Sequence, residues 1–316
     1  MHFGARLETV ARNIPPCSSF ADIGTDHAYL PVLLLQQCKI EKAVAGDVVP
    51  GPCEAARKTV HSFGFTGKLD VRLGSGLTVV QPGECQVFAI CGMGAGTMVQ
   101  ILDESPQVWQ HPSCQALVLQ PMSDSALLRH WCEQHGWAIA HEDLAQEGER
   151  LYEILVLKPQ PGWKYPGTCY LVGQDLVDQH HPLLEPFVTQ LQDKYLKLLA
   201  SMEKSPRAIH TPQYREYQET AKQLEEISAI PAQLDKIIEK IEHSNAKLAN
   251  DISQSVKQSL TSTTPKNISD NRDRYYAQDT IPNWMKISGW IALIIIAIVG
   301  IMNIVLMFFP INNVNA

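Results

Sequence analysis

Between Phe20 and Pro159, short apolar runs alternate with amphipathic segments, and this alternation constrains the fold more than any other feature of the sequence. The runs are FADIG, AVAGD, LDVRL, QVFAIC, ALVLQP, WAIAHEDLA and LYEILVLK. Strands that alternate with helices form crossover units, so we expect an α/β fold with a mostly parallel sheet covered by helices on both faces. Only QEGER separates the last two runs, which predicts an antiparallel hairpin at one edge and the end of the sheet near Pro159.

Composition limits the classes of function. The chain has 316 residues, a formal charge of -7 and eight cysteines, none of them in a C-x-x-C pair. Without such pairs we expect neither a zinc site nor a disulfide framework, and we predict no metal and core thiols in a reducing cytosol. The negative charge does not favour a strong nucleic-acid binder, so an RNA-binding surface would be a local patch. The N-terminal stretch up to Pro15 and Pro16 predicts an amphipathic helix rather than a signal peptide.

The region after the sheet has helical periodicity. Apolar residues recur three or four apart from Leu183 to Met202, and again through Tyr214 and Leu224, which predicts two helices that pair as an antiparallel hairpin. A further apolar seam with the polar Asn245 within it follows, formed by Leu234, Ile238, Ile241, Leu248 and Ile252. The pattern leaves open whether this seam self-associates as a coiled coil or rests on its neighbours.

The C-terminal segment contains a polar stretch and then an apolar one. TSTTPKNISDNRDRYYAQDT predicts a disordered linker, whereas Ile287 to Phe309 is almost wholly apolar and would span about 30 Å as a helix, enough for a bilayer core. Trp284 and Trp290 suit interfacial anchors, and basic residues precede the span but do not follow it, which predicts a cytoplasmic catalytic domain anchored to the inner membrane. The predicted domains are a catalytic domain at 1–165, a helical coiled-coil region at 166–260, a linker at 261–286 and a transmembrane helix at 287–309.

The turn after the first strand indicates the ligand. In ADIGTDHAYLP, a phosphate-binding G-x-G-x-x-G turn would have glycine where this chain has Asp26 and Tyr29. A carboxylate repels phosphate at a helix N-terminus, so Asp26 argues against a dinucleotide. S-adenosylmethionine instead offers a sulfonium, an ammonium and ribose hydroxyls, all of which suit carboxylates. Asp22 ends the first strand, and Asp47 ends the second, where an acid usually binds ribose hydroxyls.

Two further glycine-rich turns end strands of the same predicted sheet, GSG at 74–76 and CGMGAG at 91–96. Ligands of open parallel sheets lie beyond the carboxyl ends of the strands, so these turns predict a binding site at that edge. Taken alone, Asp22 could instead be a helix cap. Proline is tolerated in the first turn of a helix, so Pro31 predicts a helix start at about His27 or Ala28.

ADIGTDHAYLP, DVVPGP, VRLGSGL, CGMGAG, LVLQP and LYEI, in this order and spacing, resemble the TrmK-type bacterial tRNA (adenine-22-N1)-methyltransferases over roughly residues 1–228. The resemblance implies a class I, Rossmann-like methyltransferase fold and methyl transfer from S-adenosyl-L-methionine to N1 of adenosine 22 in tRNA. It also implies that Asp22 and Gly24 line the methionine part of the cofactor and that Asp47 binds the ribose. The remaining implied cofactor residues are Gly74, Ser75 and Gly76 at the adenine edge and Gly92, Met93 and Gly94 beneath the transferring methyl group.

The chain departs from this family pattern at Ser75, because the family usually has G-D-G there. A carboxylate that would accept from the adenine amino group is replaced by a shorter hydroxyl, so we expect a lower cofactor affinity. Cys91 and Ala95 are smaller departures from the usual A-G-M-G-G. The linker and the apolar span are not part of the family pattern.

Adenine N1 carries no proton, so its methylation needs alignment rather than a strong general base. The methylated base is cationic, which makes Asp26 and His27 the candidate catalytic residues, since a carboxylate or a neutral imidazole stabilises such a charge. Both could instead have only local roles in the turn. Gln120 and Pro121, at the end of the fifth strand, are candidates for the base pocket.

Phosphate contacts with tRNA are expected from basic residues, each of which could also be a solvated surface charge. These residues are Arg6 and Arg12 on the first helix, Arg57, Lys58, Lys194 and Lys197. Two alternative functions stay open. The chain could methylate another RNA or a small molecule, or it could be a membrane-tethered scaffold whose cofactor pocket is degenerate at Ser75.

Overall fold

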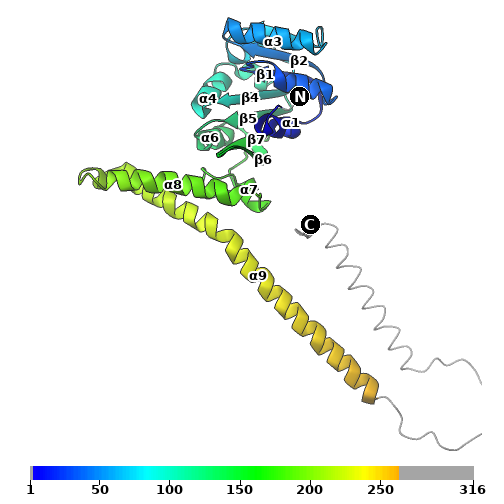
Figure 1. Cartoon of the computed structure of the whole chain (residues 1–316), viewed down its shortest axis with the longest axis vertical. Helices are drawn as coiled ribbons and strands as arrows, with labels where there is room; N and C mark the ends of the chain where they lie inside the picture. Colours follow the sequence, from blue (N-terminus) through cyan, green and yellow to red (C-terminus); the bar gives the residue numbers. More distant parts are fainter. Residues whose placement is uncertain (1–2, 263–316) are drawn as a thin grey trace, which may run out of the picture. The chain divides into compact units, whose positions relative to one another are not determined.

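The structure is a computed structural model that describes residues 3–262, except the side chains of 231–235 and 259–262. Within this part, seven strands form one sheet in the order β3-β2-β1-β4-β5-β7-β6 (Figure 1). The strands are β1 (Cys17–Ile23), β2 (Ile40–Asp47), β3 (Leu69–Leu73), β4 (Val87–Met93), β5 (Ala116–Pro121), β6 (Trp137–Glu147) and β7 (Arg150–Pro159). Neighbours among β1 to β5 are parallel, and β7 is antiparallel to β5 and β6. The predicted parallel sheet and edge hairpin are therefore confirmed.

Helices cover both faces of the sheet and bury two apolar cores. One face carries α1 (Ala5–Asn13), α2 (Tyr29–Gln36) and α3 (Pro50–Ser62). The other carries the 3-10 helix η1 (Gly76–Val79), α4 (Ala95–Asp103), α5 (Pro106–Trp109) and α6 (Ser125–His135). Alternate residues of a strand point to opposite faces, so Phe20 enters the first core while Ala21 enters the second. With both faces covered, the carboxyl edge of the parallel strands is the part of the sheet available to a ligand.

The start of α2 differs from the prediction by one or two residues. Ala28 has a left-handed φ of 54°, so it precedes the helix, which begins at Tyr29. The backbone N–H of Ala28 donates to Thr25 Oγ1 at 3.1 Å, which stabilises this tight turn. Pro31 is the third helical residue and lies in the first turn, as expected.

Helices follow the sheet, as the periodicity predicts. They are α7 (Gln174–Asp178), α8 (Leu184–Met202), the 3-10 helix η2 (Ala208–His210) and α9 (Pro212–Ser262). The helix α8 and the first part of α9 lie side by side (Figure 1), with the rings of Tyr195 and Tyr217 5.5 Å apart. Gln192 Nε2 donates to Ser228 Oγ at 3.3 Å, so the two helices are antiparallel. The predicted helical hairpin is confirmed, and the predicted apolar seam continues α9 rather than forming another helix.

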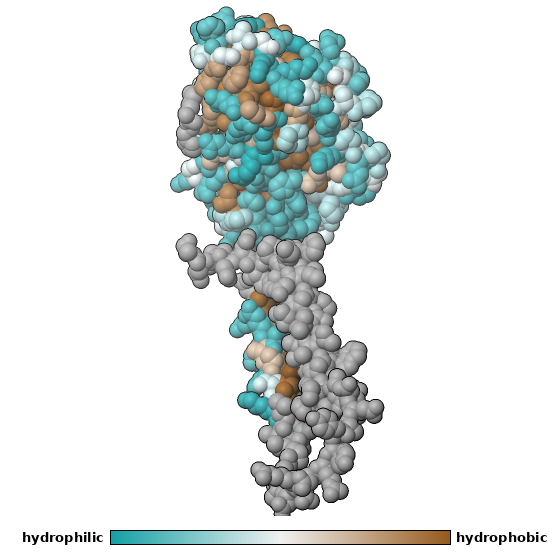
Figure 2. Space-filling model, turned by 90° about the vertical axis from the view of Figure 1, so that its right-hand side faces the viewer, coloured by the Kyte–Doolittle hydropathy of each residue, from teal (hydrophilic) through white to brown (hydrophobic). Residues whose placement is uncertain are grey.

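Apolar side chains are exposed on the later part of α9 (Figure 2). They are Ile237, Ile238, Ile241, Leu248, Ile252 and Val256. The described residues divide into two units, one that ends at Asn245 and one that begins at Ala246. Among the helices of residues 3–262, none combines the length and apolar character that a bilayer crossing requires. The predicted linker beyond Ser262 and the predicted span from Ile287 to Phe309 lie outside the described residues.

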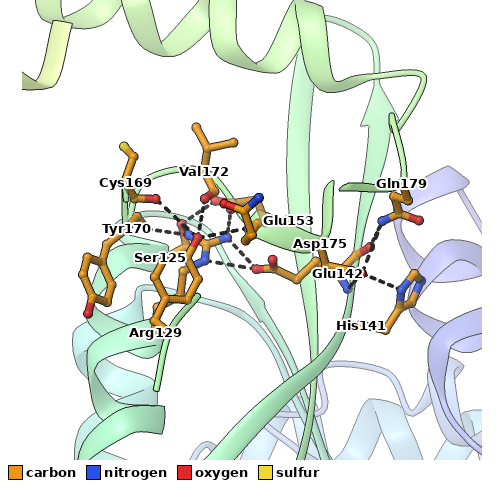
Figure 3. A network of polar contacts seen from close by, with 12 residues as sticks. Ser125, Arg129, His141, Glu142, Glu153, Cys169, Tyr170, Val172, Asp175 and Gln179 are labelled. Atoms are coloured by element: carbon orange, nitrogen blue, oxygen red, sulfur yellow. Dashed lines mark hydrogen bonds and ion pairs between the residues drawn. The ribbon is translucent and has the colours of Figure 1, made fainter. Parts of the chain in front are cut away.

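A buried ion-pair network joins α6 to the edge hairpin (Figure 3). Arg129 of α6 is fully buried, and its Nη2 lies 2.7 Å from Glu142 Oε1 on β6 and 2.6 Å from Glu153 Oε1 on β7. Its Nη1 donates to Ser125 Oγ at 3.0 Å and to the carbonyl of Tyr170 at 2.8 Å. These contacts hold the segment before α7 against the sheet.

All eight cysteines are free thiols, and most of them are buried, as the composition predicts. Cys38 is the exposed one among them. Burial raises the pKa of the Cys85 and Cys114 thiols to about 12, so these thiols stay protonated and behave as apolar core groups.

Candidate active site

The carboxyl end of β1 carries a buried carboxylate. Asp22 is 7% exposed, and burial raises the pKa of its carboxyl to about 6, with the nearby Asp47 carboxylate adding to the rise and a hydrogen bond to Thr25 opposing it. The N–H groups of Gly24 and Thr25 both donate to the Gly46 carbonyl, at 2.8 and 3.0 Å, which fixes the turn against β2. Asp22 has no ion-pair partner within residues 3–262, so a bound cation would remove the cost of ionising it.

Thr25 is a site residue that the sequence analysis missed. Its side chain is buried, accepts from the N–H of Ala28 and hydrogen-bonds the Asp22 carboxyl. A hydroxyl residue four positions before the start of the helix was the signal that could have identified it, because such residues stabilise turns through their side chains.

Two glycines at this edge have conformations that other residues rarely adopt. Gly24 has a φ of +80°, and a Cβ there would overlap the Met93 methyl group. Gly92, at the end of β4, has a φ of +75°. Met93 therefore lies directly against the turn after β1. Because Gly24 and Gly92 have no side chains, the backbone at the ends of β1 and β4 stays accessible to a ligand.

Gly24 lines two hollows. The larger has a volume of about 390 Å³ and is lined by residues that include Arg6, Asp22, Asp26 and His27. The smaller, about 210 Å³, is lined by residues that include Gly46, Asp47, Val48, Ser75, Gly76, Met93 and Ile101. Sequence-predicted cofactor residues from four strand ends thus come together around one glycine.

The smaller hollow contains carboxylates and no basic side chain among the described residues that line it. Asp47 Oδ1 accepts from the N–H of Val49 at 2.7 Å, which holds the carboxylate at the end of β2. Ser75 is exposed at the rim, and the N–H of the preceding Gly74 donates to the Asp47 carbonyl at 2.9 Å. This charge arrangement suits hydroxyls and an uncharged ring and disfavours a nucleotide phosphate.

Asp26 and His27 lie at the solvent side of the larger hollow. Their side chains are 76% and 42% exposed, and His27 Nε2 lies 3.4 Å from Asp26 Oδ2. The His27 ring stacks on Tyr29 at 5.1 Å, and Phe3 lies 5.6 Å from the same tyrosine ring. The entrance therefore combines one carboxylate with flat side chains that suit contact with a nucleobase.

The sequence analysis predicts that Arg6 contacts tRNA phosphate and that Gln120 shapes the base pocket. In the structure these two residues contact each other. Arg6 Nη1 donates to Gln120 Oε1 at 2.7 Å, and the same oxygen accepts from the N–H of Gly92 at 3.2 Å. Gln120 is fully buried, and its Nε2 donates to the carbonyl of Pro121 at 2.9 Å. Gln120 therefore has its hydrogen-bonding groups satisfied by protein and orients Arg6.

The other predicted RNA contacts lie elsewhere. Arg12 pairs with Asp143 at 2.8 Å, with 66% of its side chain exposed. Arg57 lines a hollow of about 680 Å³ beside β3, which also includes Thr66 and Lys68 from the turn at the amino end of that strand. Although this hollow is larger, it runs along β3 from Leu69 to Arg72 and its lining lacks the strand-end turns at Gly24, Ser75 and Gly92, where a ligand of a parallel sheet is expected. Lys194 and Lys197 lie on α8.

The residues around Gly24 fit S-adenosylmethionine. Asp22 matches an ammonium group, Asp47 matches a ribose diol, and Val48 and Ile101 offer apolar surface for a ring. Because both hollows are lined by Gly24, which has no side chain, one extended ligand could contact both.

Three comparisons support this interpretation. Residues 3–155 match a family model described as a methyltransferase domain. The tRNA (adenine(22)-N(1))-methyltransferase of Bacillus subtilis (strain 168) is 35% identical over 151 residues, which are 48% of this chain and 63% of that protein, so the alignment spans less than two thirds of this relative. The crystal structure of the B. subtilis m1A22 tRNA methyltransferase TrmK is 27% identical, with a TM-score of 0.65 over 72% of this chain and 99% of that chain. Streptococcus pneumoniae Sp1610 in complex with S-adenosyl-L-methionine is 30% identical, with a TM-score of 0.63 over 72% of this chain and 100% of that chain.

The fold is that of Rossmann-like methyltransferases, and residues 3–155 match the methyltransferase-domain model. The likeness to the two solved structures extends over nearly their whole chains. The chain belongs to the TrmK-type tRNA (m1A22) methyltransferase family.

Proposed function

We propose that this protein transfers a methyl group from S-adenosylmethionine to N1 of adenosine 22 in bacterial tRNA. The observation that carries the proposal is the pair of hollows around Gly24, each with a carboxylate at the carboxyl edge of the sheet. The B. subtilis relative is named for this reaction. When bound, S-adenosylmethionine supplies an electrophilic methyl group.

The binding roles follow from charge. Asp22, held in place by Thr25, binds the ammonium group, and Asp47 accepts hydrogen bonds from the ribose hydroxyls. Ser75 lies at the adenine side, where its hydroxyl is a weaker acceptor than a carboxylate. Gly92 lines the larger hollow and Met93 the smaller one, and together with Gly94 they form the floor beneath the transferring methyl group.

The acceptor needs positioning rather than activation. Adenine N1 has a free lone pair, so no residue has to remove a proton before attack, and the chain's contribution is to align the base. Asp26 and His27 face the entrance and stabilise the positive charge that develops on the base. A paired adenine must first leave the stack, at a cost of a few kcal/mol.

The decisive experiment is methyl transfer to matched tRNA transcripts. The full chain, tritiated S-adenosylmethionine and an unmodified bacterial tRNA transcript should give 1-methyladenosine, and the transcript with guanosine at position 22 should stay unlabelled. Equal labelling of both transcripts would remove position 22 from the proposal. Labelling of a small molecule but of neither transcript would favour the alternative enzyme. Absence of calorimetric heat with the cofactor would favour the scaffold.

The remaining RNA contacts are proposed from sequence and exposure. Arg12, Arg57, Lys58, Lys194 and Lys197 are placed as phosphate contacts because each is a basic side chain outside the hollows. Replacing any one of them with glutamine should weaken tRNA binding uniformly and reduce its salt dependence.

The tail is proposed to anchor the enzyme and to associate with a second copy. The predicted domain division and the apolar run from Ile287 to Phe309 support the anchor, and the exposed Ile238, Ile241, Leu248 and Ile252 on α9 support the association. The full chain should co-float with vesicles, whereas a chain truncated after Thr280 should stay soluble and active. Light scattering of that truncated chain at rising concentration tests the association.

A further inference from the structure

Arg6 is held inside the larger hollow by contacts from three directions. Its backbone N–H donates to Glu147 Oε1 at 3.0 Å, and its Nη1 donates to Gln120 Oε1 at 2.7 Å. Its guanidinium lies 5.6 Å from the centre of the Tyr152 ring. These partners come from β5 and from both strands of the edge hairpin, so the guanidinium is preorganised although it belongs to an N-terminal helix.

The guanidinium has donors left for a ligand. Within the described residues, the contact with Gln120 is the one hydrogen bond made by the Arg6 side chain, and no carboxylate pairs with it. Arg6 is also the one lysine or arginine among the described residues that line the hollow. A cation with free donors in a hollow indicates an anionic ligand group.

The neighbours of Arg6 decide which anion fits. Arg6, Asp22 and Cys91 line the same hollow. Burial is the main cause of the raised pKa of the Cys91 thiol, the Asp22 carboxylate adds to the rise and the Arg6 guanidinium opposes it. A ligand at Arg6 is therefore also close to a buried carboxylate, with Asp26 at the same hollow. A phosphodiester carries no positive group to satisfy these acids, whereas an α-amino acid carries a carboxylate and an ammonium on one carbon.

The geometry points to Arg6 as the residue that binds the carboxylate of the methionine part of S-adenosylmethionine, with Gln120 as its positioning residue. This assignment rests on the proposed function and replaces the sequence-based role of Arg6 as a tRNA phosphate contact. Asp22 and Arg6 then bind the two charges of one amino-acid group. Recognition of this group distinguishes S-adenosylmethionine from nucleosides that lack it.

The test compares the affinities of two protein variants for two ligands, as in a double-mutant cycle. Calorimetry measures the affinity of wild type and Arg6→Gln for S-adenosylmethionine and for decarboxylated S-adenosylmethionine, which lacks only the carboxylate. Arg6→Gln should weaken binding of the first ligand at least about tenfold, as expected for loss of a charge-assisted pair, and change binding of the second less than about twofold. Arg215→Gln, an exposed arginine on α9, is the matched control and should bind both ligands as wild type does.

Each other result overturns the assignment. Equal losses for both ligands would show that Arg6 only supports the structure, and no loss for either would show that it binds something else, such as tRNA phosphate. Arg6→Lys should recover part of the affinity because it keeps the charge. The calorimetric measurement needs no tRNA, so it is independent of the proposed tRNA reaction. If that reaction were disproved, a selective loss of S-adenosylmethionine affinity in Arg6→Gln would still support the assignment. If no selective loss were found, the proposed tRNA reaction would be unaffected.

Discussion

The guanidinium of Arg129 and the carboxylate of Glu142 form an ion pair away from solvent. Their Nη2 and Oε1 atoms are 2.7 Å apart, and the side chains are 0% and 2% exposed. Glu153 on β7 lies 2.6 Å from the same nitrogen (Figure 3), so one cation pairs with two carboxylates of the edge hairpin. Without that cation, both acids would be left partly or wholly buried without a counter-charge.

Arg129→Met is therefore expected to lower the free energy of unfolding by about 3–5 kcal/mol. Urea unfolding followed by circular dichroism measures this change. The matched control is the triple variant Arg129→Met, Glu142→Gln, Glu153→Gln, which removes the charges together and should lose less stability. If the single and triple variants are equally stable, uncompensated charge is not the cause.

Gly24→Ala tests the need for glycine between the hollows. Alanine at a φ of +80° costs about 1–2 kcal/mol, and its Cβ would displace the Met93 methyl group. We expect lower thermal stability and at least about tenfold weaker binding of S-adenosylhomocysteine, measured by calorimetry. Gly51→Ala is the control, because a Cβ there meets nothing within 4 Å. Similar behaviour of the two variants would exclude a special role for Gly24.

Much of the fold follows from short-range pattern. The strand runs and the brevity of QEGER were enough to predict the parallel sheet and its hairpin, since both depend on residues close in sequence. The turns at Gly24 and Gly92 were likewise recognisable, because a positive φ restricts the residue type. The position of the ligand edge then follows from sheet topology.

The partners of Arg129 and Arg6 could not be predicted in this way. Arg129 lies in DSALLRHWCEQHG, where it looks like a surface residue, and its acids are 13 and 24 positions away on two strands. Arg6 lies 114 positions from Gln120, and only the packing of α1 against the end of β5 brings the two together. Long-range pairing of polar groups has no local periodicity, so the sequence gives no signal for it.

Ser75→Asp tests whether the departure from the family pattern weakens cofactor binding. A carboxylate accepts a stronger, charge-assisted hydrogen bond than a hydroxyl, so we expect S-adenosylmethionine to bind about fivefold more tightly. Ser75 is exposed, so the change should leave thermal stability nearly unaltered. Ser75→Asn, similar in size but uncharged, should gain less. An equal gain in both variants would indicate size rather than charge as the cause.

Asp22→Asn should make the ligand-free protein more stable at neutral pH. The folded-state pKa of Asp22, about 6, lies above its usual value of 3.8, so the folded protein holds this proton more tightly than the unfolded chain does. The contribution of Asp22 to the free energy of unfolding is fully present below about pH 4 and is lost as the pH rises through its folded-state pKa of about 6. At higher pH the free energy of unfolding no longer changes because of this group. An asparagine carries no ionisable proton, so the variant does not lose stability as the pH rises. At pH 7.5 its free energy of unfolding, measured in urea, should exceed that of wild type by roughly 2–3 kcal/mol, and below pH 4 the two should be equal.

Binding should change in the opposite direction, because the ammonium group of the ligand needs the ionised carboxylate. In wild type, calorimetry should show affinity for S-adenosylhomocysteine nearly constant above pH 7 and falling up to tenfold for each pH unit below about 6, where Asp22 takes up its proton. Asp22→Asn should bind weakly throughout and lose this dependence. A variant that is both less stable and unchanged in affinity would mean that Asp22 is a structural cap, and the cation-binding role of the β1 turn would then be wrong.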